Sequence, residues 1–340
     1  MVRKKYNVAV VGIGAVGTEM LKVLHQRDFP AKSIRVLART ARAEEIAGKT
    51  YQVEETTADA FTGVDIAIFA GTEGAKGASQ LFGWQAVAKG AVVIDNGDDF
   101  RMDPRVPLVV PECNAEALRS HQGFIANPNC STIQMVVALA PLHRVARVRR
   151  IVVSTYQAVS GTGRQAIDEL RSQATAIERG QEPQATVYPH RIAFNLFPHI
   201  GRPTDEMPGY YTEEVKMRRE TRKILGDPDI QVSATCVRVP VYNAHSEAIN
   251  VQFEKKLTAA EAREILQSAP GVVVIDDMAK AGYPTPLMAS GTDPVYVGRI
   301  RDDVSAPNCL DLWCVSDNIR KGAALNAVQI AETMIQMGLI

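Results

Sequence analysis

A glycine-rich turn near the N-terminus constrains the fold of this chain more than any other feature of its sequence. The run Val8–Val11 is apolar throughout and leads into a loop made of Gly12, Ile13, Gly14, Ala15, Val16 and Gly17. A helical pattern follows, with Val16, Met20, Val23 and Leu24 on one face. Glycines at this spacing let backbone N–H groups approach a pyrophosphate at the N-terminus of the helix. The pattern predicts a dinucleotide-binding unit, and the alternative is an ordinary turn between a strand and a helix.

The remainder of the first 130 residues repeats this alternation of short apolar runs and helical patterns. Most of the runs are apolar on both faces, which is typical of strands buried between two layers of helices. The expected strands are Tyr6–Val11, Ser33–Arg39, Asp65–Ala70, Ala91–Asn96, Leu108–Pro111 and Phe124–Ala126. Alternating strands and helices predict an α/β fold with a Rossmann-type, doubly wound parallel sheet.

The pattern changes after residue 130, where strands outnumber helices. A buried helix is expected over Ser131–Leu142 and another helix begins near Arg164. The expected strands are Arg150–Tyr156, Ile230–Val237, Ala248–Phe253, Val272–Ile275, Val295–Arg301 and Leu310–Val315. We expect an α+β domain with a larger antiparallel or mixed sheet over residues 131–319. Residues 1–130 form the nucleotide-binding domain, which a C-terminal helix in residues 320–340 completes.

Charge and cysteine content narrow the class of protein. Lys and Arg together number 38, as do Asp and Glu, so nothing favours binding to nucleic acid or to an anionic membrane. The five cysteines lie far apart without a CxxC pair, which is typical of free thiols in a reducing compartment. The apolar runs are about six to ten residues long, short of the ~18–20 that span a bilayer. With no signal-peptide pattern, we expect a cytoplasmic protein.

The end of the second strand bears on the choice of cofactor. An NAD-binding unit commonly carries Asp or Glu there, to hold the ribose 2′-hydroxyl. This sequence instead has Arg39 and Thr40, with Arg42 nearby. Because guanidinium groups suit phosphate, the pattern predicts NADP. The alternative is that both arginines are solvated charges on a loop.

Cys130 stands where a Pro-Asn pair ends a strand and a helix is expected to begin. A thiol at a helix N-terminus is exposed to the helix dipole, which lowers its pKa and favours the nucleophilic thiolate. The N–H groups of the same turn can hold an oxyanion when a carbonyl is attacked. The sequence therefore makes Cys130 a candidate nucleophile, and a buried structural cysteine is the alternative.

Around this cysteine the chain resembles the aspartate-semialdehyde dehydrogenases. The similarity runs nearly end to end, and several of its motifs are eight or more residues long. The motifs are residues 127–132 around Cys130, 154–161 with Gln157, 238–245 from Arg238 to His245, 95–96 with 100–103, 109–112, 195–201 and 316–326.

The resemblance implies that L-aspartyl 4-phosphate and NADPH give aspartate 4-semialdehyde, NADP and phosphate. It makes Cys130 the nucleophile of a thioacyl enzyme and His245 its acid/base partner, and Gln157 orients the acyl group. The implied substrate-binding residues are Arg238 for the α-carboxylate, Glu213 for the α-ammonium group, Arg101 and Lys216 for phosphate, and Asn129. The implied cofactor contacts are the loop Gly12 to Gly17, Arg39, Thr40, Ser160, Gly161 and Asn318, and no metal is expected.

Two of these residue assignments have an alternative residue nearby or of the same type. His199 is a second candidate imidazole, and Glu214 adjoins Glu213; the three-residue spacing from Glu213 to Lys216 matches the family pattern. Three departures from the family concern the cofactor and phosphate: the shortened glycine loop, Arg39 in place of Ser with a longer loop over Thr40–Ala47, and Asn96-Gly97-Asp98 in place of Asn-Ser-Ser.

Two other functions remain open at this point. One is the N-acetyl-glutamyl-phosphate reductase reaction, which uses the same chemistry on a longer, acylated substrate. The other is a non-catalytic, nucleotide-binding paralogue, which would have no reason to keep Cys130, Gln157, Arg238 and His245 together. By analogy we expect a homodimer through the second domain, or a dimer of dimers.

Overall fold

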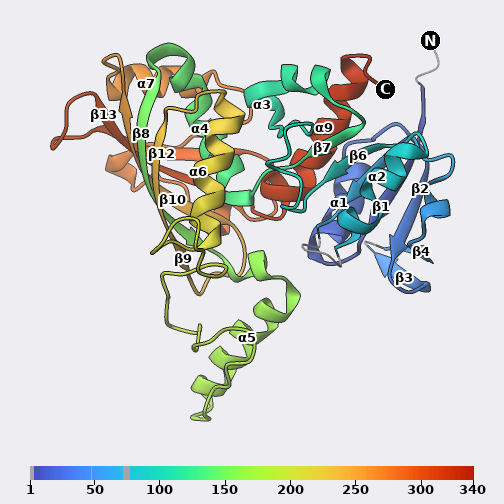
Figure 1. The fold of residues 1–340 in the computed structure, drawn as a ribbon. Coiled ribbons are helices and arrows are strands. Elements are labelled where there is room, and N and C mark those ends of the chain that lie inside the picture. The colour runs from blue at the N-terminus through green and yellow to red at the C-terminus, as the bar shows by residue number, and fades with distance from the viewer. Residues whose placement is uncertain (1–3, 47, 72–76) are drawn as a thin grey trace. The chain divides into compact units, whose positions relative to one another are not determined.

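The chain divides into two compact units in the computed structural model, which describes residues 4–46, 48–71 and 77–340 (Figure 1). The first unit comprises residues up to Asn129 together with Gly322–Ile340. The second unit comprises Cys130–Lys321. Among the described residues, no helix is long and apolar enough to cross a bilayer.

The first unit is built on a seven-stranded sheet with the strand order β3-β4-β2-β1-β5-β6-β7. Every neighbouring pair is parallel except β3 and β4, which confirms the Rossmann-type prediction. The strands are β1 (Tyr6–Val11), β2 (Ala31–Ala38), β3 (Arg42–Ile46), β4 (Lys49–Glu55), β5 (Ile66–Phe69), β6 (Val92–Asp95) and β7 (Phe124–Ala126).

Helices cover both faces of this sheet. Helices α1 (Ala15–Gln26) and α9 (Leu325–Gln336) share one apolar core with β1 and β5, to which Met20 and Val328 contribute. On the other face, Phe69 of β5 stacks on Phe61, which contacts Phe82 of α2 (Ala78–Ala88). The shorter elements are η1 (Ala58–Phe61), α3 (Pro111–Asn114), η2 (Ala115–Ser120) and the π-helical turn η5 (Arg320–Ala324) that leads into α9.

Two expectations for this unit are wrong. The segment after Thr40 is not a loop, because Arg42–Ile46 forms β3 and pairs with β4 in an antiparallel hairpin. Its residues are mostly polar and exposed, so they lack the apolar pattern that marks a buried strand. Leu108–Pro111 is not a strand; Leu108 makes only an isolated bridge to Ala126, and Pro111 begins α3.

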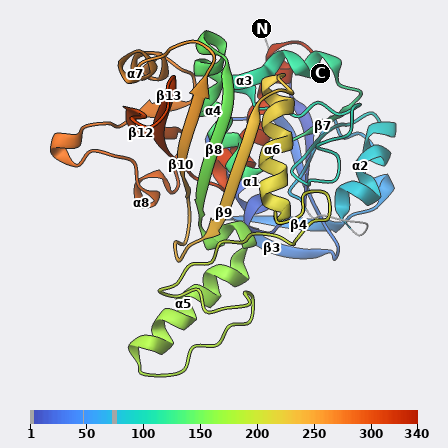
Figure 2. The same ribbon diagram turned by 60° about the vertical axis from the view of Figure 1, so that its left-hand side comes forward.

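The second unit contains a mixed six-stranded sheet with the order β11-β12-β13-β10-β8-β9, as expected. Helices α4 (Cys130–Ala146), α6 (Thr212–Leu225) and α7 (Ala259–Gln267) pack on one face of it (Figures 1 and 2). The strands are β8 (Val148–Gln157), β9 (Gln231–Arg238), β10 (His245–Phe253), β11 (Val272–Val274), β12 (Val295–Asp302) and β13 (Cys309–Ser316). The remaining elements are η3 (Val159–Thr162), α5 (Arg164–Glu178), η4 (Met278–Lys280) and α8 (Pro286–Ala289).

The glycine loop of the first unit shows why two of its glycines differ in importance. A Cβ atom on Gly17 would lie 1.9 Å from the carbonyl oxygen of Gly12, which itself has a φ of +92°. Helix α1 can therefore approach β1 closely only if residue 17 lacks a side chain. Among the residues that the structure describes, none outside the loop's own neighbours has a heavy atom within 4 Å of the ideal Cβ position of Gly14, so these residues leave the space in front of the loop open.

We expect Gly17→Ala to lower the free energy of unfolding by about 1–3 kcal/mol, because backbone must shift to admit the methyl group. Gly14→Ala is the matched control and should cost less than about 1 kcal/mol, since its methyl group meets nothing. Urea denaturation of both variants measures the difference. Equal losses would show that contact with Gly12 does not set the loop geometry.

Candidate active site

The register of the second sheet places four polar residues in one row across β9, β8, β10 and β13. Arg238 pairs with Gln157, and His245 pairs with Ser316. The pairing of Ser246 with Tyr156 puts His245 beside Gln157. All four side chains are buried, and they point to the face that α4 and α6 cover. We call Arg238, Gln157, His245 and Ser316 the functional row.

Gln157 connects this row to the start of α4. Its Nε2 donates to the hydroxyl oxygen of Ser131 at 2.7 Å and to Oε1 of Glu213 at 3.3 Å. Cys130 is the first residue of α4 and remains partly exposed, whereas Ser131 is fully buried. The helix therefore begins at the cysteine, as the sequence predicted, and its first turn lies against the functional row.

His245 is fully buried, and one of its ring nitrogens is already engaged. The backbone N–H of Ala158 donates to Nδ1 at 3.0 Å, while Nε2 has no hydrogen-bond partner among residues 4–46, 48–71 and 77–340. Burial, and secondly the nearby Arg238 guanidinium, hold the pKa of His245 well below its ordinary value, against a smaller opposing contribution from the Ala244 backbone. A neutral imidazole that accepts at Nδ1 carries its proton on Nε2. His245 is therefore a hydrogen-bond donor at Nε2 in the resting site.

Arg238 is buried at the end of β9, and the same turn helps to position it. Its Nη1 donates to the carbonyl oxygen of Ala158 at 2.5 Å, and its guanidinium lies 5.8 Å from the ring centroid of Tyr188. A Cβ atom on Gly161 would lie 3.2 Å from Nη1 of Arg238 and 3.4 Å from Nε2 of His245. Gly161 thus faces both groups, and a side chain there would fill the space in front of them.

The structure distinguishes Glu213 from Glu214 as the candidate carboxylate, and His245 from His199 as the candidate imidazole. Both oxygens of Glu214 are engaged by backbone, accepting from the N–H groups of Tyr211 and Cys236. Glu213 instead reaches the functional row through Gln157. His199 is packed between the rings of Phe197 and Tyr211, with centroid distances of 5.5 Å and 5.1 Å. Glu213 therefore contacts the functional row through Gln157, and His245 belongs to the row.

Three of the other cysteines have unreactive surroundings. Burial raises the pKa of Cys236 and Cys314 well above the ordinary value, and for Cys236 the nearby Glu213 carboxylate adds to it. Burial also raises the pKa of Cys309. A raised pKa keeps the thiol protonated and slow to react.

The first unit contains the residues that could hold a dinucleotide. Gly14 is the N-cap residue of α1 and has no side chain. No N-cap side chain therefore accepts a hydrogen bond from the first backbone N–H groups of the helix, which begins at Ala15 and Val16. Arg39 and Thr40 are exposed at the end of β2. Arg42 is ion-paired with Glu44 at 2.8 Å and also donates to the carbonyl oxygen of Thr40. Arg42 is therefore partly neutralised, which leaves Arg39 as the better candidate for a phosphate.

Arg101 is buried and holds backbone in place within the first unit. Its Nε donates to the carbonyl oxygen of Asn127 at 2.9 Å, and its Nη2 donates to that of Asn96 at 2.8 Å. At the departure from the family at Gly97, a Cβ atom would lie 3.1 Å from the Asp95 carboxylate, so a side chain there would require that group to shift slightly. Asn129 is buried at the end of this unit, whereas Lys216 lies half-buried on α6 of the second unit.

Comparison with known proteins identifies the family. The family model for the semialdehyde dehydrogenase NAD-binding domain matches residues 7–121, and that for the semialdehyde dehydrogenase dimerisation domain matches residues 139–321. The chain is 51% identical to an aspartate-semialdehyde dehydrogenase of Aquifex aeolicus, covering 98% of this chain and 99% of that one. The chain belongs to the aspartate-semialdehyde dehydrogenase family.

Solved structures of the aspartate-semialdehyde dehydrogenases have the same fold. Aspartate semialdehyde dehydrogenase II from Vibrio cholerae is 42% identical, with a TM-score of 0.93 over 98% of this chain and 99% of that chain. The same Vibrio cholerae enzyme complexed with ASA gives a TM-score of 0.92 at the same identity and coverage.

Within this aspartate-semialdehyde dehydrogenase fold, the turn before His245 is held by residues that the sequence did not assign to that task. Ala244 has a φ of +71°, which is unfavourable for a residue with a side chain, and its N–H donates to Oδ1 of Asn318 at 3.0 Å. Ser160 is hydrogen-bonded to Asn318 and to Asn243, and Asp317 accepts from Asn243 at 2.7 Å. Ser160 and Asn318, expected at the cofactor, therefore also support His245. No sequence signal shows this, because the turn conformation depends on contacts between distant segments.

Among the residues that the structure describes, no group of three or more His, Cys, Asp or Glu side chains is arranged to hold a metal ion.

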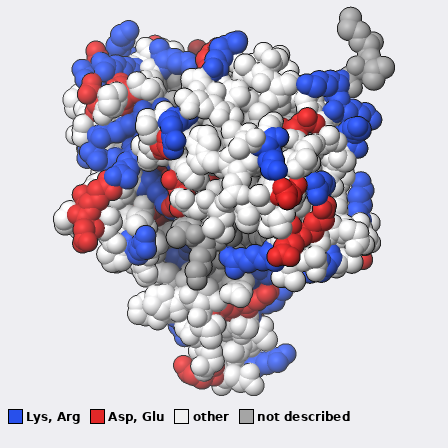
Figure 3. Space-filling view, turned by 45° about the vertical axis from the view of Figure 1, so that its right-hand side comes forward, with Lys and Arg blue, Asp and Glu red and all other residues white. Residues whose placement is uncertain are grey.

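On the face drawn in Figure 3, Lys and Arg side chains lie interspersed with Asp and Glu side chains.

Proposed function

We propose that this protein is an aspartate-semialdehyde dehydrogenase, which reduces L-aspartyl 4-phosphate to aspartate 4-semialdehyde and phosphate with NADPH. The observation that carries the proposal is the link from the first turn of α4 to the functional row, through the Ser131 to Gln157 hydrogen bond of 2.7 Å. This link sets Cys130 at the same end of the sheet as Arg238 and His245. The Vibrio cholerae relative, with 42% identity, forms a complex with ASA, which supports a substrate of this class.

In the first step, the Cys130 thiolate attacks the acyl phosphate. A bond forms between sulfur and the acyl carbon, phosphate leaves with the electrons of the carbon–oxygen bond, and a thioester remains. The position at the N-terminus of α4 favours the thiolate and places N–H groups near the carbonyl oxygen. NADPH, when bound, supplies the hydride that reduces the thioester carbonyl. Cys130 then departs as thiolate and the aldehyde is released.

His245 acts first as a hydrogen-bond donor in this scheme. Its Nε2–H can stabilise negative charge on oxygen or sulfur, and a low pKa keeps the ring neutral while it does so. The family resemblance also implies proton transfer. Accepting a proton at Nε2 requires the other nitrogen to give up its hydrogen bond from Ala158 N–H, so we expect transfer to accompany opening of that contact.

Arg238 and Glu213 account for the charged ends of the substrate. Nη1 of Arg238 donates to the Ala158 carbonyl oxygen. A guanidinium has five N–H donors, so further donors can pair with an α-carboxylate. Glu213 supplies a carboxylate for an α-ammonium group. An N-acetylated substrate has no such ammonium group, so the reductase of acetylated glutamyl phosphate is less well supported. Arg101, Asn129 and Lys216 remain proposals for the phosphate-binding and substrate-binding roles.

We assign NADP to the first unit. The open space before Gly14 and the close approach of Gly17 to Gly12 fit a pyrophosphate against the N-terminus of α1. Gly12, Ile13, Gly14, Ala15, Val16 and Gly17 would hold it through backbone groups, and Arg39 with Thr40 would meet the 2′-phosphate. Ser160, Gly161 and Asn318 of the second unit remain proposed cofactor contacts. Their observed hydrogen bonds show a supporting role as well.

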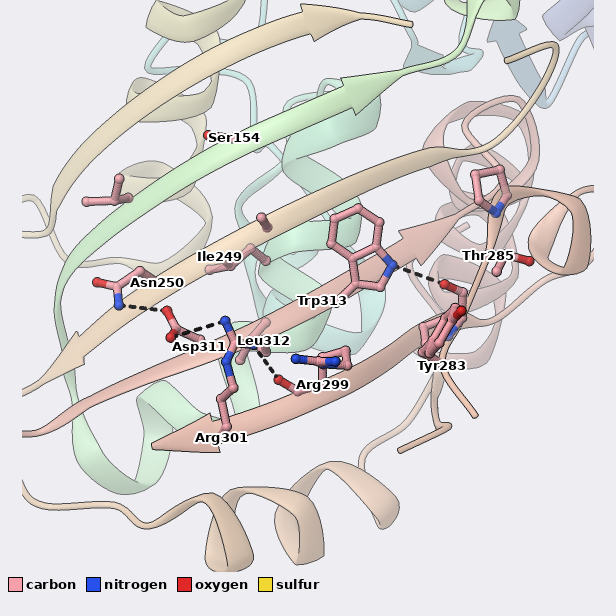
Figure 4. A pocket seen from close by; sticks show the side chains of 14 residues that line it. Ser154, Ile249, Asn250, Tyr283, Thr285, Arg299, Arg301, Asp311, Leu312 and Trp313 are labelled. Atoms are coloured by element: carbon pink, nitrogen blue, oxygen red, sulfur yellow. Dashed lines mark hydrogen bonds and ion pairs between the residues drawn. The ribbon is translucent and has the colours of Figure 1, made fainter. Parts of the chain in front are cut away.

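The second unit offers a face for a second copy of the chain. Strands β8, β10 and β13 line a cavity of about 580 Å³ on the side of the sheet opposite to α4 (Figure 4). Trp313 lies on this face, where its Nε1 donates to the Pro284 carbonyl, and Asp311 is bonded to both Asn250 and Arg301. Because residues 139–321 match a dimerisation domain, we propose that the dimer forms through this face. A dimer of dimers stays a prediction.

Cys130→Ser should abolish phosphate-dependent NADP reduction with aspartate 4-semialdehyde, because a hydroxyl is too weak a nucleophile to replace the thiolate. The circular-dichroism spectrum and melting temperature should stay unchanged. In the wild type, iodoacetamide should label Cys130 before Cys236 and Cys314, whose pKa values burial raises. Mass spectrometry of peptides gives the order. Turnover by Cys130→Ser would contradict the covalent mechanism.

Arg39→Ala should reduce the preference for NADP over NAD without harming the use of NAD. One charge-assisted contact is worth roughly 1.5–3 kcal/mol when partly buried, so the ratio of kcat/KM values should fall by about ten- to a hundredfold. Arg42→Ala is the matched control, because Arg42 is already paired with Glu44. A wild-type enzyme that prefers NAD, or equal effects of both variants, would place the 2′-phosphate elsewhere.

Ala248→Arg should convert the dimer to a monomer, because it puts an unpaired charge in the proposed interface beside the cavity. Val145→Arg is the control, since Val145 is exposed on α4, on the opposite side of the sheet. Light scattering after size-exclusion chromatography measures the mass of each variant. A dimeric Ala248→Arg protein would rule out this face.

A further inference from the structure

A second row of side chains lies directly behind the functional row. Two residues further along each strand, the register aligns Cys236 with Thr155, Thr155 with Glu247 and Glu247 with Cys314. All four side chains are fully buried. One row further still, the residues are apolar, namely Ala234, Val153, Ile249 and Leu312. Glu247 is therefore an acidic residue enclosed between the active site and the hydrophobic core.

Helix α4 places Gln134 over this row. Gln134 is buried, with 1% of its surface exposed, and its backbone carbonyl accepts from the Cys314 thiol at 3.7 Å. Since it follows Cys130 by four residues, it lies one helical turn away on the same side of α4. Glu247 stands in the same relation to His245, two residues along β10 on the same face. Gln134 and Glu247 therefore lie next to Cys130 and His245, on the same side of α4 and on the same face of β10.

The side-chain polar atoms of Gln134 and Glu247 are unpaired within the part of the chain that the structure describes. Both polar atoms of Gln134 and both carboxyl oxygens of Glu247 are buried there and lack a hydrogen bond of ordinary length. Burial raises the pKa of Glu247 well above its ordinary value, and hydrogen bonding with Gln134 lowers it to a smaller extent. The two side chains are therefore near one another but not closely docked, and the carboxyl group is held in its neutral form.

We propose that Glu247, as a neutral carboxylic acid paired with the Gln134 amide, is a positioning residue that sets Cys130 over the functional row. A carboxylic acid and an amide are complementary: the acid O–H donates to Oε1 of Gln134, and Nε2 donates back to the acid carbonyl. This pair satisfies all four buried atoms. A carboxylate has no proton to give, so ionisation would leave Oε1 of Gln134 facing negative charge and would loosen the first turns of α4.

The groups around Glu247 oppose its ionisation. Cys314 on β13 is a neutral thiol, and Cys236 on β9 is another, beyond Thr155 of β8. Glu213 and Glu214 of α6 act on the same row with negative charge. His245 on β10 is neutral, and α4 contributes the Gln134 amide. Among these groups no cation faces the carboxyl group, so the pair with Gln134 depends on the proton.

This inference rests on the proposed role of Cys130, and its test compares Glu247→Gln with Glu247→Leu in the full-length enzyme. Misplacement of a reacting group can cost up to about a hundredfold, so Glu247→Leu should lower kcat by about ten- to a hundredfold. The KM for aspartate 4-semialdehyde should change little, because Arg238 and Glu213 are untouched. Glu247→Gln should rescue kcat, since two amides can also pair. Its activity and its rate of Cys130 alkylation should persist at alkaline pH, where those of the wild type decline as Glu247 ionises.

Thr155→Val is the matched control, in the same row and fully buried, and it should leave kcat within about twofold because the hydroxyl it removes has no hydrogen-bond partner among the described residues. Should Glu247→Leu fail to fold, the alkaline profiles of the wild type and Glu247→Gln decide the matter. Identical profiles would overturn the proposal, as would a Glu247→Gln variant as impaired as Glu247→Leu, or a Glu247→Leu variant with normal kcat. Failure of the proposed function itself is distinguishable, because the wild type would then show no phosphate-dependent NADP reduction with aspartate 4-semialdehyde.

Discussion

The pairing register of β8, β9 and β10 is the constraint on which the active site depends. Arg238, Gln157 and His245 come from three strands and share one row only because the strands align as they do. Side chains alternate between the faces of a sheet, so a slip of one residue would turn Gln157 away from α4 and bring Tyr156 there. The apolar residues two rows behind, such as Val153 and Ile249, make such a slip costly because they would lose their burial.

Burial gives the residues of this sheet their chemical properties. His245 and Glu247 lie on one strand, two residues apart, and both are enclosed. The absence of water disfavours charge on either, so the imidazole stays unprotonated and the carboxyl group stays protonated. Cys130, the first residue of α4, is the nucleophile candidate that keeps contact with solvent. The same helix therefore carries a reactive thiol at its start and a buried amide one turn later.

Glycines without side chains keep space open at the proposed cofactor and substrate sites. In the first unit, Gly17 admits no side chain because it lies against Gly12, whereas Gly14 leaves space in front of α1. In the second unit, Gly161 keeps the space before Arg238 and His245 open in the same way. Backbone without side chains thus borders the proposed sites for cofactor and substrate, where a ligand must approach closely.

The sequence by itself determined the parallel first sheet, the mixed second sheet and the helix that begins at Cys130, because apolar periodicity and glycine spacing are local signals. Motif resemblance also indicated Gln157, Arg238 and His245. It did not reveal the β3–β4 hairpin, whose residues are polar and exposed, nor the bridge that replaces a strand at Leu108. Only the tertiary structure decided that Glu213 rather than Glu214 meets Gln157, that Asn318 holds the turn before His245, and that Glu247 lies behind it. Those relations join residues far apart in the chain, and strand register and helix packing settle them rather than any local preference.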